Sequence, residues 1–193
     1  MKVSIFGHSY VRDLSQLGNR LVNVKELPVH FSYFSYPGFS FSDFLEKPHL
    51  LDCLIQEDPD IVVVVLGGND LKVNVELVQV RENCENFFKL LREKVPRAYL
   101  VASQIETRHC ETVNRHGSPS KELFKKLAVN FNKWLNKQTF KDKILIVNGD
   151  SKLGNCKYFK GDGVHLNSEG LKLYFDLIVD CLSVTPPISK NGH

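Results

Sequence analysis

The stretch DIVVVVLG occupies residues 60–67 and is apolar at every position from Ile61 to Leu66. A strand with one face in water alternates between apolar and polar residues, whereas a strand covered on both faces is apolar throughout. The glycine that closes the stretch marks the start of a turn. We therefore predict that this stretch is a central strand with helices packed on both faces.

Four further short runs have strand composition, at residues 2–7, 29–36, 98–103 and 143–149. Apolar residues recur at helical spacing in three segments between or after these runs, at 74–95, 119–137 and 168–183. Strands that alternate with helices form parallel sheets. The sequence therefore predicts an α/β protein, a three-layer α/β/α sandwich of the flavodoxin-like type with a five-stranded parallel sheet.

The chain has 193 residues and a net charge of +3. This length fits a single domain, and so small a charge does not by itself indicate nucleic-acid binding. The five cysteines form no CxxC pair, and the N-terminus lacks the long apolar segment of a signal peptide. We expect a cytoplasmic protein with one domain over residues 1–183 and a linker or disordered tail over 184–193.

Polar and glycine residues follow the predicted strands at one edge of the sheet. The four segments are GHS (7–9), PGFS (37–40), GGND (67–70) and DGVH (162–165), the last of which directly precedes the final helix. Ligands of open parallel sheets bind outside the carboxyl ends of the strands. The sequence therefore predicts a functional site where these four segments meet.

Three residues of these segments have the chemistry of a serine nucleophile and its base. The hydroxyl of Ser9 needs a base to take its proton, and neutral histidine does this near neutral pH. Asp162 and His165 are three residues apart. If they span one turn, the carboxylate accepts from His165 Nδ1 and leaves Nε2 facing Ser9, as in an acid–base–nucleophile triad.

Two further residues are candidate donors to the negative oxygen of a tetrahedral intermediate. Gly38 offers a backbone N–H with no side chain in the way, and Asn69 offers a side-chain amide. Together with the N–H of Ser9, these groups form a predicted oxyanion hole.

Each segment also has a structural explanation when it is taken alone. Ser9 could cap a helix after a tight turn, and Asn69 could cap the helix that follows Gly68. Asp162 could simply form a turn, with His165 packed in the core. The hydrolase interpretation depends on all four segments occurring in order at one rim.

The four segments resemble the sequence blocks of the SGNH (GDSL-like) hydrolase superfamily, over nearly the whole chain and in the same order. The resemblance implies a flavodoxin-like fold, no metal or cofactor, and hydrolysis of an ester or similar acyl bond. It also implies catalytic roles for Ser9, Asp162 and His165, and oxyanion-hole roles for Gly38 and Asn69. The chain departs from the family pattern at His8, where the family has an aspartate.

The segment FGHSYVRDL (6–14) is similar to a narrower group, the esterase domain in the first-open-reading-frame protein of certain LINE-type retrotransposons. The expected partner is a small ester or acylated substrate, with lipid as one option. Binding of nucleic acid through a larger parent protein is a weaker hypothesis. Oligomeric state is not predicted.

Two other function classes stay open at this point. Within enzymes, the substrate could be a thioester or a carbohydrate ester. From a different class, the chain could be a catalytically silent module of the same fold that binds RNA, a membrane surface or a protein. Because Ser9, Asp162 and His165 are all present, an active serine esterase is the leading hypothesis.

Three other patterns receive less weight. His109, Cys110 and His116 do not have the spacing of a standard metal site. Lysines recur on the segment 119–137 at near-helical spacing, which is typical of a solvated helix face. Phe39 and Phe41 flank Gly38 and are candidates for the walls of an acyl pocket.

Overall fold

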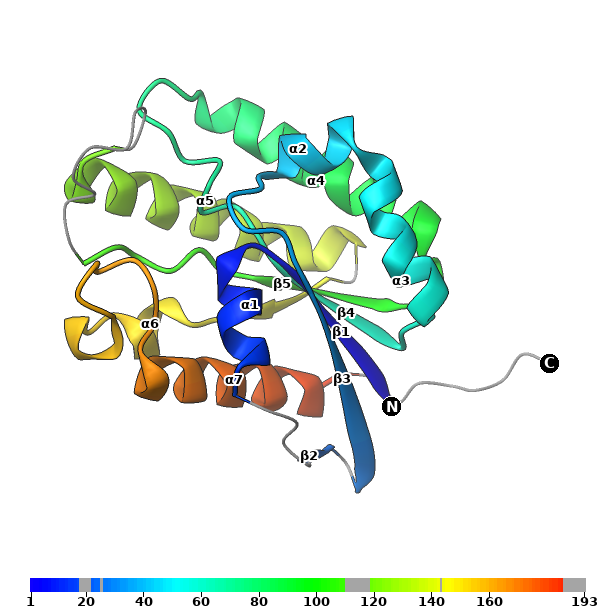
Figure 1. Ribbon diagram of the computed structural model, residues 1–193. Helices are drawn as coiled ribbons and strands as arrows, with labels where there is room; N and C mark the ends of the chain where they lie inside the picture. Colours follow the sequence, from blue (N-terminus) through cyan, green and yellow to red (C-terminus); the bar gives the residue numbers. More distant parts are fainter. Residues whose placement is uncertain (18–21, 25, 110–118, 143, 186–193) are drawn as a thin grey trace.

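The computed structural model describes residues 1–17, 22–24, 26–109, 119–142 and 144–185. Over these residues the chain forms a mostly parallel six-stranded sheet with helices on both faces (Figure 1). The predicted three-layer α/β arrangement is therefore confirmed. The predicted number of five strands is wrong by one. Of the predicted tail, residues 186–193 lie outside the described residues.

The strands are β1 (Lys2–Gly7), β2 (Val22–Val24), β3 (Leu27–Ser35), β4 (Ile61–Val65), β5 (Tyr99–Ser103) and β6 (Leu145–Val147). They lie in the order β2-β3-β1-β4-β5-β6. All neighbours are parallel except β2, which pairs antiparallel with the start of β3 at the edge of the sheet. This strand is the additional one, and three residues are too few to show the alternation that identifies a strand in sequence.

The α-helices are α1 (Ser9–Ser15), α2 (Phe41–Glu46), α3 (Asp52–Glu57), α4 (Leu77–Lys94), α5 (Lys121–Asp142), α6 (Asp150–Leu153) and α7 (Ser168–Ser183). Two short 3₁₀ segments, η1 (Pro48–Leu51) and η2 (Cys156–Tyr158), complete the described elements. The three predicted helices correspond to α4, α5 and α7, and the last has the predicted bounds. The short helices have too few turns to produce a clear periodicity.

Strand β4 contributes to the core on both faces, as its uniformly apolar sequence predicts. Val62 and Val64 pack with Phe6 against α2, α3, α4 and α5. Ile61, Val63 and Val65 pack on the other face against α1 and α7. Successive side chains of a strand point to opposite faces, so one run of valines serves two cores. Complete burial of one such side chain is worth about 1.5–3 kcal/mol.

The carboxyl ends of the central strands finish at the same level. Gly7 of β1 pairs with Ser35 of β3 on one side and with Val65 of β4 on the other. The chain passes from β1 to β3 on one side of β1, and later in the sequence it forms β4 on the other side. The direction in which strands are added to the sheet therefore changes at β1, which makes this a topological switch point. Crevices at such points are where open α/β sheets bind ligands. The segments after β1, β3 and β4 therefore meet in one place.

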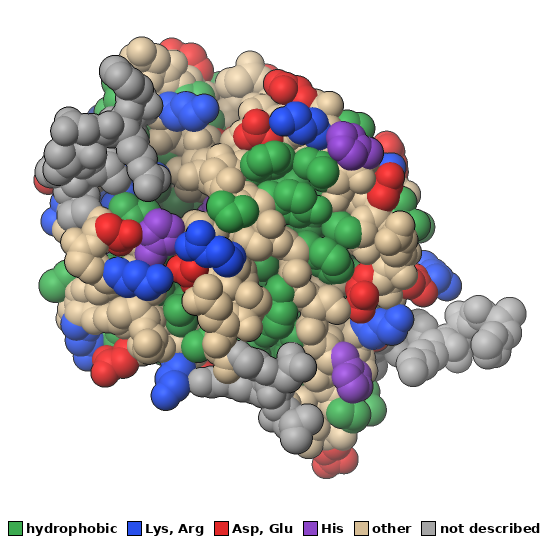
Figure 2. Space-filling model, viewed as in Figure 1, with side chains coloured by type: hydrophobic (Ala, Val, Ile, Leu, Met, Phe, Trp, Pro, Cys, Tyr) green, Lys and Arg blue, Asp and Glu red, His purple; other side chains and the backbone are tan. Residues whose placement is uncertain are grey.

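Hydrophobic side chains are visible on the face of the molecule shown in Figure 2, alongside scattered charges. Several partly buried aromatic residues, including Phe34, Tyr36 and Phe39, lie at the end of β3 and before α2, packed against the core below them.

No helix in the described part of the chain is both long enough and apolar enough to cross a membrane.

Candidate active site

Ser9 lies at the first turn of α1, immediately after β1. The preceding Gly7 has φ +155°, and a side chain there would collide with the carbonyl oxygen of Val65. Only glycine therefore lets β1 turn this closely past β4 into α1. The N-cap of α1 is His8, whose Nδ1 accepts from the N–H of Tyr10 at 3.4 Å. Ser9 is thus not the cap, and its hydroxyl is available for other contacts.

His165 and Asp162 lie on the loop between η2 and α7, and this loop is held by its own backbone. The N–H of Lys160 donates to the carbonyl of His165 at 2.7 Å, and Phe159 forms an isolated antiparallel bridge with Leu166. Asn167 then caps α7 by accepting from the N–H of Gly170. The loop therefore has a fixed shape directly before the helix, which sets the position of His165.

The three predicted residues form one hydrogen-bonded chain. Nε2 of His165 lies 3.1 Å from Oγ of Ser9, and Nδ1 of His165 lies 2.7 Å from Oδ2 of Asp162. The other oxygen of Asp162 accepts from the backbone N–H groups of Val164 and His165, both at 2.9 Å. Asp162 therefore forms the turn that the structural explanation expected and also orients the His165 ring.

The carboxyl of Asp162 is ionised near neutral pH. Its partial burial acts to raise the pKa, but the hydrogen bonds from the His165 ring and from two backbone N–H groups outweigh this effect and lower the pKa to about 2. A carboxylate can only accept, so Nδ1 of His165 is the donor in that pair. In the neutral ring, Nε2 is then the acceptor and faces the hydroxyl of Ser9.

Two contacts tie the loop of His165 to the helix of Ser9. The hydroxyl of Tyr10 donates to the carbonyl of Val164 at 2.5 Å. On the next turn of α1, the buried carboxylate of Asp13 forms an ion pair with Lys160 at 3.2 Å. A hydrogen bond and an ion pair therefore connect residues next to Ser9 with residues next to His165, which restricts changes in the distance between Ser9 and His165.

The predicted donors Gly38 and Asn69 come from neighbouring loops. Gly38 is exposed and has φ +86°, a left-handed conformation that favours glycine. Nδ2 of Asn69 donates to the carbonyl of Phe39 at 2.9 Å, which joins the two loops. Nδ2 carries a second N–H, so this bond leaves one donor for another partner. Asn69 does not cap a following helix, since α4 begins at Leu77 with Glu76 as its N-cap.

Asp70 holds the same two loops together from the core side. Both of its carboxylate oxygens accept from the N–H of Phe41, at 3.1 and 3.2 Å. Burial raises the pKa of Asp70 to about 7, against the effect of that backbone hydrogen bond. Within the GGND segment, Asn69 therefore lies at the surface of the site, whereas Asp70 holds the loop of Phe41 in position.

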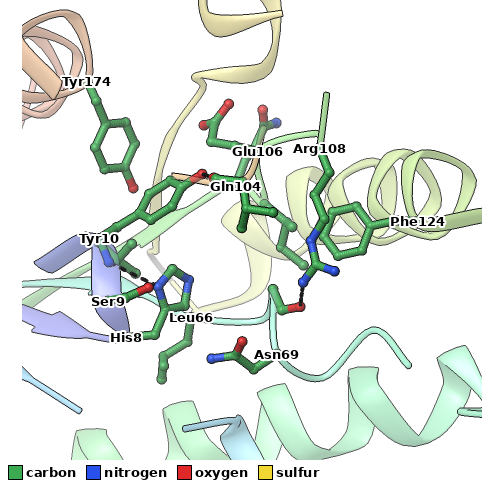
Figure 3. A pocket seen from close by; sticks show the side chains of 14 residues that line it. His8, Ser9, Tyr10, Leu66, Asn69, Gln104, Glu106, Arg108, Phe124 and Tyr174 are labelled. Atoms are coloured by element: carbon green, nitrogen blue, oxygen red, sulfur yellow. Dashed lines mark hydrogen bonds between the residues drawn. The ribbon is translucent and has the colours of Figure 1, made fainter. Parts of the chain in front are cut away.

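A partly open pocket lies beside Ser9 and Asn69 (Figure 3). Its further lining includes His8, Tyr10, Gln104, Glu106, Arg108, Phe124 and Tyr174. Gln104, Glu106 and Arg108 belong to the long segment after β5 and were not predicted as site residues. Their only signal in the sequence was the length of that loop, since long loops in compact domains are often functional.

Two weaker sequence hypotheses, an acyl pocket walled by Phe39 and Phe41 and a metal site at His109, find no support among the described residues. Phe41 lies in the core against Phe87 rather than in the pocket, and Phe39 packs on Tyr36 and Phe44. No cluster of three or more metal-ligating side chains occurs where the structure describes the chain. The His109 ring packs at a tilt against Phe159, whereas Cys110 and His116 lie outside the described residues.

A family model described as "GDSL-like Lipase/Acylhydrolase family" matches residues 7–173. No curated protein sequence matches the chain.

Solved structures of similar fold include a lipase/acylhydrolase from Enterococcus faecalis, which is 20% identical with a TM-score of 0.67, over 94% of this chain and 95% of that one. A member of the lipolytic G-D-S-L family from Veillonella parvula is 14% identical with a TM-score of 0.67, over 96% of this chain and 100% of that one. A carbohydrate esterase family 3 protein from Talaromyces cellulolyticus is 17% identical with a TM-score of 0.62, over 94% of this chain and 96% of that one. At these identities the structures show a shared fold.

Proposed function

This chain belongs to the GDSL-like lipase/acylhydrolase family, and on that premise we propose that it is a serine esterase that works through an acyl-enzyme. The observation that supports this proposal most directly is the hydrogen-bonded chain from Ser9 through His165 to Asp162. The order of its groups, a hydroxyl, an imidazole facing it and a carboxylate behind the imidazole, is the order that supports such a mechanism.

In the proposed first half-reaction, Oγ of Ser9 attacks the ester carbonyl while Nε2 of His165 takes the hydroxyl proton. The carbonyl π electrons move to its oxygen, which becomes the oxyanion of a tetrahedral intermediate. Asp162 stabilises the imidazolium that forms. The intermediate then collapses, the bond to the leaving alcohol breaks, and His165 gives that alcohol its proton.

The second half-reaction repeats the first with water. His165 removes a proton from water, whose oxygen attacks the acyl carbon of the acylated Ser9. Collapse of the second intermediate releases the carboxylic acid and returns the proton to Ser9. In both steps, the N–H groups of Ser9, Gly38 and Asn69 are the proposed donors to the oxyanion.

The pocket beside Ser9 favours short acyl groups over long ones. Its lining combines apolar residues such as Leu66 and Ile105 with polar ones such as Gln104 and Arg108. A long alkyl chain would remove water from these polar groups without replacing their hydrogen bonds, which is unfavourable. A deacetylase acting on a polar ester is therefore a more specific form of the proposal.

Hydrolysis of p-nitrophenyl esters of increasing chain length tests the proposed activity. We expect the highest kcat/KM for the acetate, a decline toward the octanoate, and no change on addition of a chelator. Absence of turnover with every ester would favour the silent binding module. Activity that is lost in chelator and restored by zinc would replace the serine mechanism with a metal-dependent one.

The substitution Asn69→Asp tests the oxyanion hole. An aspartate keeps the size of the side chain but repels the developing oxyanion, so kcat should fall by about 10²–10³-fold with little change in KM. Steady-state kinetics on protein whose folded fraction is measured by thermal denaturation provide the check. The exposed Asn130→Asp on α5 adds the same charge elsewhere and is the control.

A purely structural role for Asn69 predicts a different result. Loss of its bond to the Phe39 carbonyl would cost about 1 kcal/mol of stability and leave turnover per folded molecule almost unchanged. A well-folded and fully active Asn69→Asp variant would therefore remove Asn69 from the proposed mechanism.

A further inference from the structure

Arg108 brings a permanent positive charge to the pocket beside Ser9. Its Nη2 donates to the carbonyl of Gly68 at 3.3 Å, next to Asn69. The guanidinium also lies over the ring of Phe124, with its central carbon 3.9 Å from the ring centroid. Phe124 is buried on α5, so this stacking fixes the cation at the pocket wall.

His8 places a second donor beside the same glycine. Because its Nδ1 accepts from the N–H of Tyr10, the neutral ring carries its proton on Nε2. A side-chain carbon added to Gly68 would lie 3.6 Å from that nitrogen, so Nε2 faces the space that the glycine leaves open. Burial lowers the pKa of His8 most, and the neighbouring His165 and Arg108 lower it further, to about 4, so the His8 ring is neutral near neutral pH.

Among the described residues, two carboxylates near the pocket, those of Asp162 and Glu106, have other neighbours. Asp162 is separated from Ser9 by the His165 ring, to which it is bonded. The carboxylate of Glu106, which also lines the pocket, lies against the backbone of Gly149, and the view of Figure 3 draws the Tyr10 ring between it and Ser9. At the end of the pocket nearest Ser9, the His8 ring and the Arg108 guanidinium stand on either side of Asn69 (Figure 3).

We infer that this site selects esters that carry a second, anionic group, a carboxylate or phosphate, which His8 Nε2–H and Arg108 bind beside the scissile bond. The inference rests on the proposed esterase function and names its class of substrate. A planar guanidinium suits both anions because it presents parallel N–H donors. An aspartate, which the family pattern has at the position of His8, would instead repel the anion.

Matched pairs of esters test this inference. Each pair joins an anionic ester to a neutral methylated form: mono-p-nitrophenyl succinate and its methyl ester for an anion on the acyl side, 4-acetoxybenzoate and its methyl ester for one on the alcohol side, and 4-acetoxyphenyl phosphate and its dimethyl ester for a phosphate. The measured quantity is the ratio of kcat/KM within a pair, after division by the rate of hydroxide-catalysed hydrolysis. We expect a ratio of about ten or more in at least one pair, in line with a charge-assisted hydrogen bond.

Variants connect this ratio to the two residues. Arg108→Gln should bring the ratio close to one, Arg108→Lys should keep part of it, and His8→Asn should lower it while retaining the helix cap. Arg97→Gln removes the same charge from an exposed position before β5, at the other end of the sheet, and should keep the wild-type ratio. High salt should reduce the ratio in the wild type, because it screens charge.

Several results would overturn the inference. One is a wild-type ratio at or below one in all three pairs, with the neutral esters still hydrolysed; the esterase proposal then stands without this substrate class. Another is a ratio that Arg108→Gln and Arg108→Lys both leave unchanged. A third is an equal fall for both members of a pair in Arg108→Gln, which would place Arg108 in support of the Gly68 loop. If no ester is hydrolysed, the proposed function itself fails.

Discussion

Ser9→Ala is expected to lower kcat by about 10⁶-fold, the size of effect that removal of a serine nucleophile has in a well-studied protease. The variant loses the atom that attacks the ester, so only binding and the oxyanion donors remain. The fold should be retained, because alanine is a good helix former and the N-cap of α1 is His8 rather than Ser9. Hydrolysis of p-nitrophenyl acetate, with helical content from circular dichroism, measures both properties.

A matched control for Ser9→Ala is Ser15→Ala at the other end of the same helix. The side chain of Ser15 is exposed, and its hydroxyl donates to the carbonyl of Arg12. Ser15→Ala should therefore keep wild-type kcat. If Ser9→Ala retained more than a small fraction of wild-type turnover while folded, another nucleophile would have to be sought.

Asp162→Asn is expected to lower kcat by about 10⁴-fold while the loop keeps its shape. The amide oxygen of asparagine can still accept from the backbone N–H groups of Val164 and His165. Its NH₂ group, however, would face Nδ1 of His165 and favour the tautomer in which Nε2 carries the proton. The base would then no longer accept from Ser9, and the positive charge formed on His165 would lose its partner.

The pH dependence of this defect follows from the low pKa of Asp162. Because that pKa is about 2, the wild-type carboxylate is ionised at every pH from about 5 upward. Titration of Asp162 should therefore not affect the ratio of wild-type to variant kcat in this range, and the ratio should be constant wherever His165 is neutral in both proteins. The check is a pH–rate profile of both proteins with one neutral ester. A small, pH-independent loss of less than tenfold would show that Asp162 serves mainly as a turn residue.

The general architecture could be predicted because hydrophobic patterning determines it locally. Residues 60–67 are apolar throughout, and the structure shows the reason, since alternate side chains of β4 pack into two separate cores. The helix over 168–183 has clear periodicity and is capped by Asn167, so its bounds could be read directly. Strand β2 was missed because it depends on pairing with β3 rather than on a pattern of its own.

Part of the candidate site could be predicted from the topology of a parallel sheet. Ser9 and Asn69 lie a few residues after the ends of β1 and β4, and the topology of parallel sheets brings such positions together. Arg108 could not be predicted, because its place depends on stacking against Phe124, from a helix that follows it in the chain. His8 stood out only as a departure from the family pattern, and its orientation depends on the N–H of Tyr10. The narrower likeness to retrotransposon esterases stays a prediction.

The most direct test of the account is to find which residue reacts with a fluorophosphonate probe, which modifies activated serine hydroxyls. After treatment of the whole protein, intact-mass spectrometry and peptide mapping should show one adduct, on Ser9, that forms in step with loss of esterase activity. Ser9→Ala should remain unlabelled. An adduct on a different residue, or continued ester hydrolysis by unlabelled protein, would contradict the assignment of Ser9 as the nucleophile.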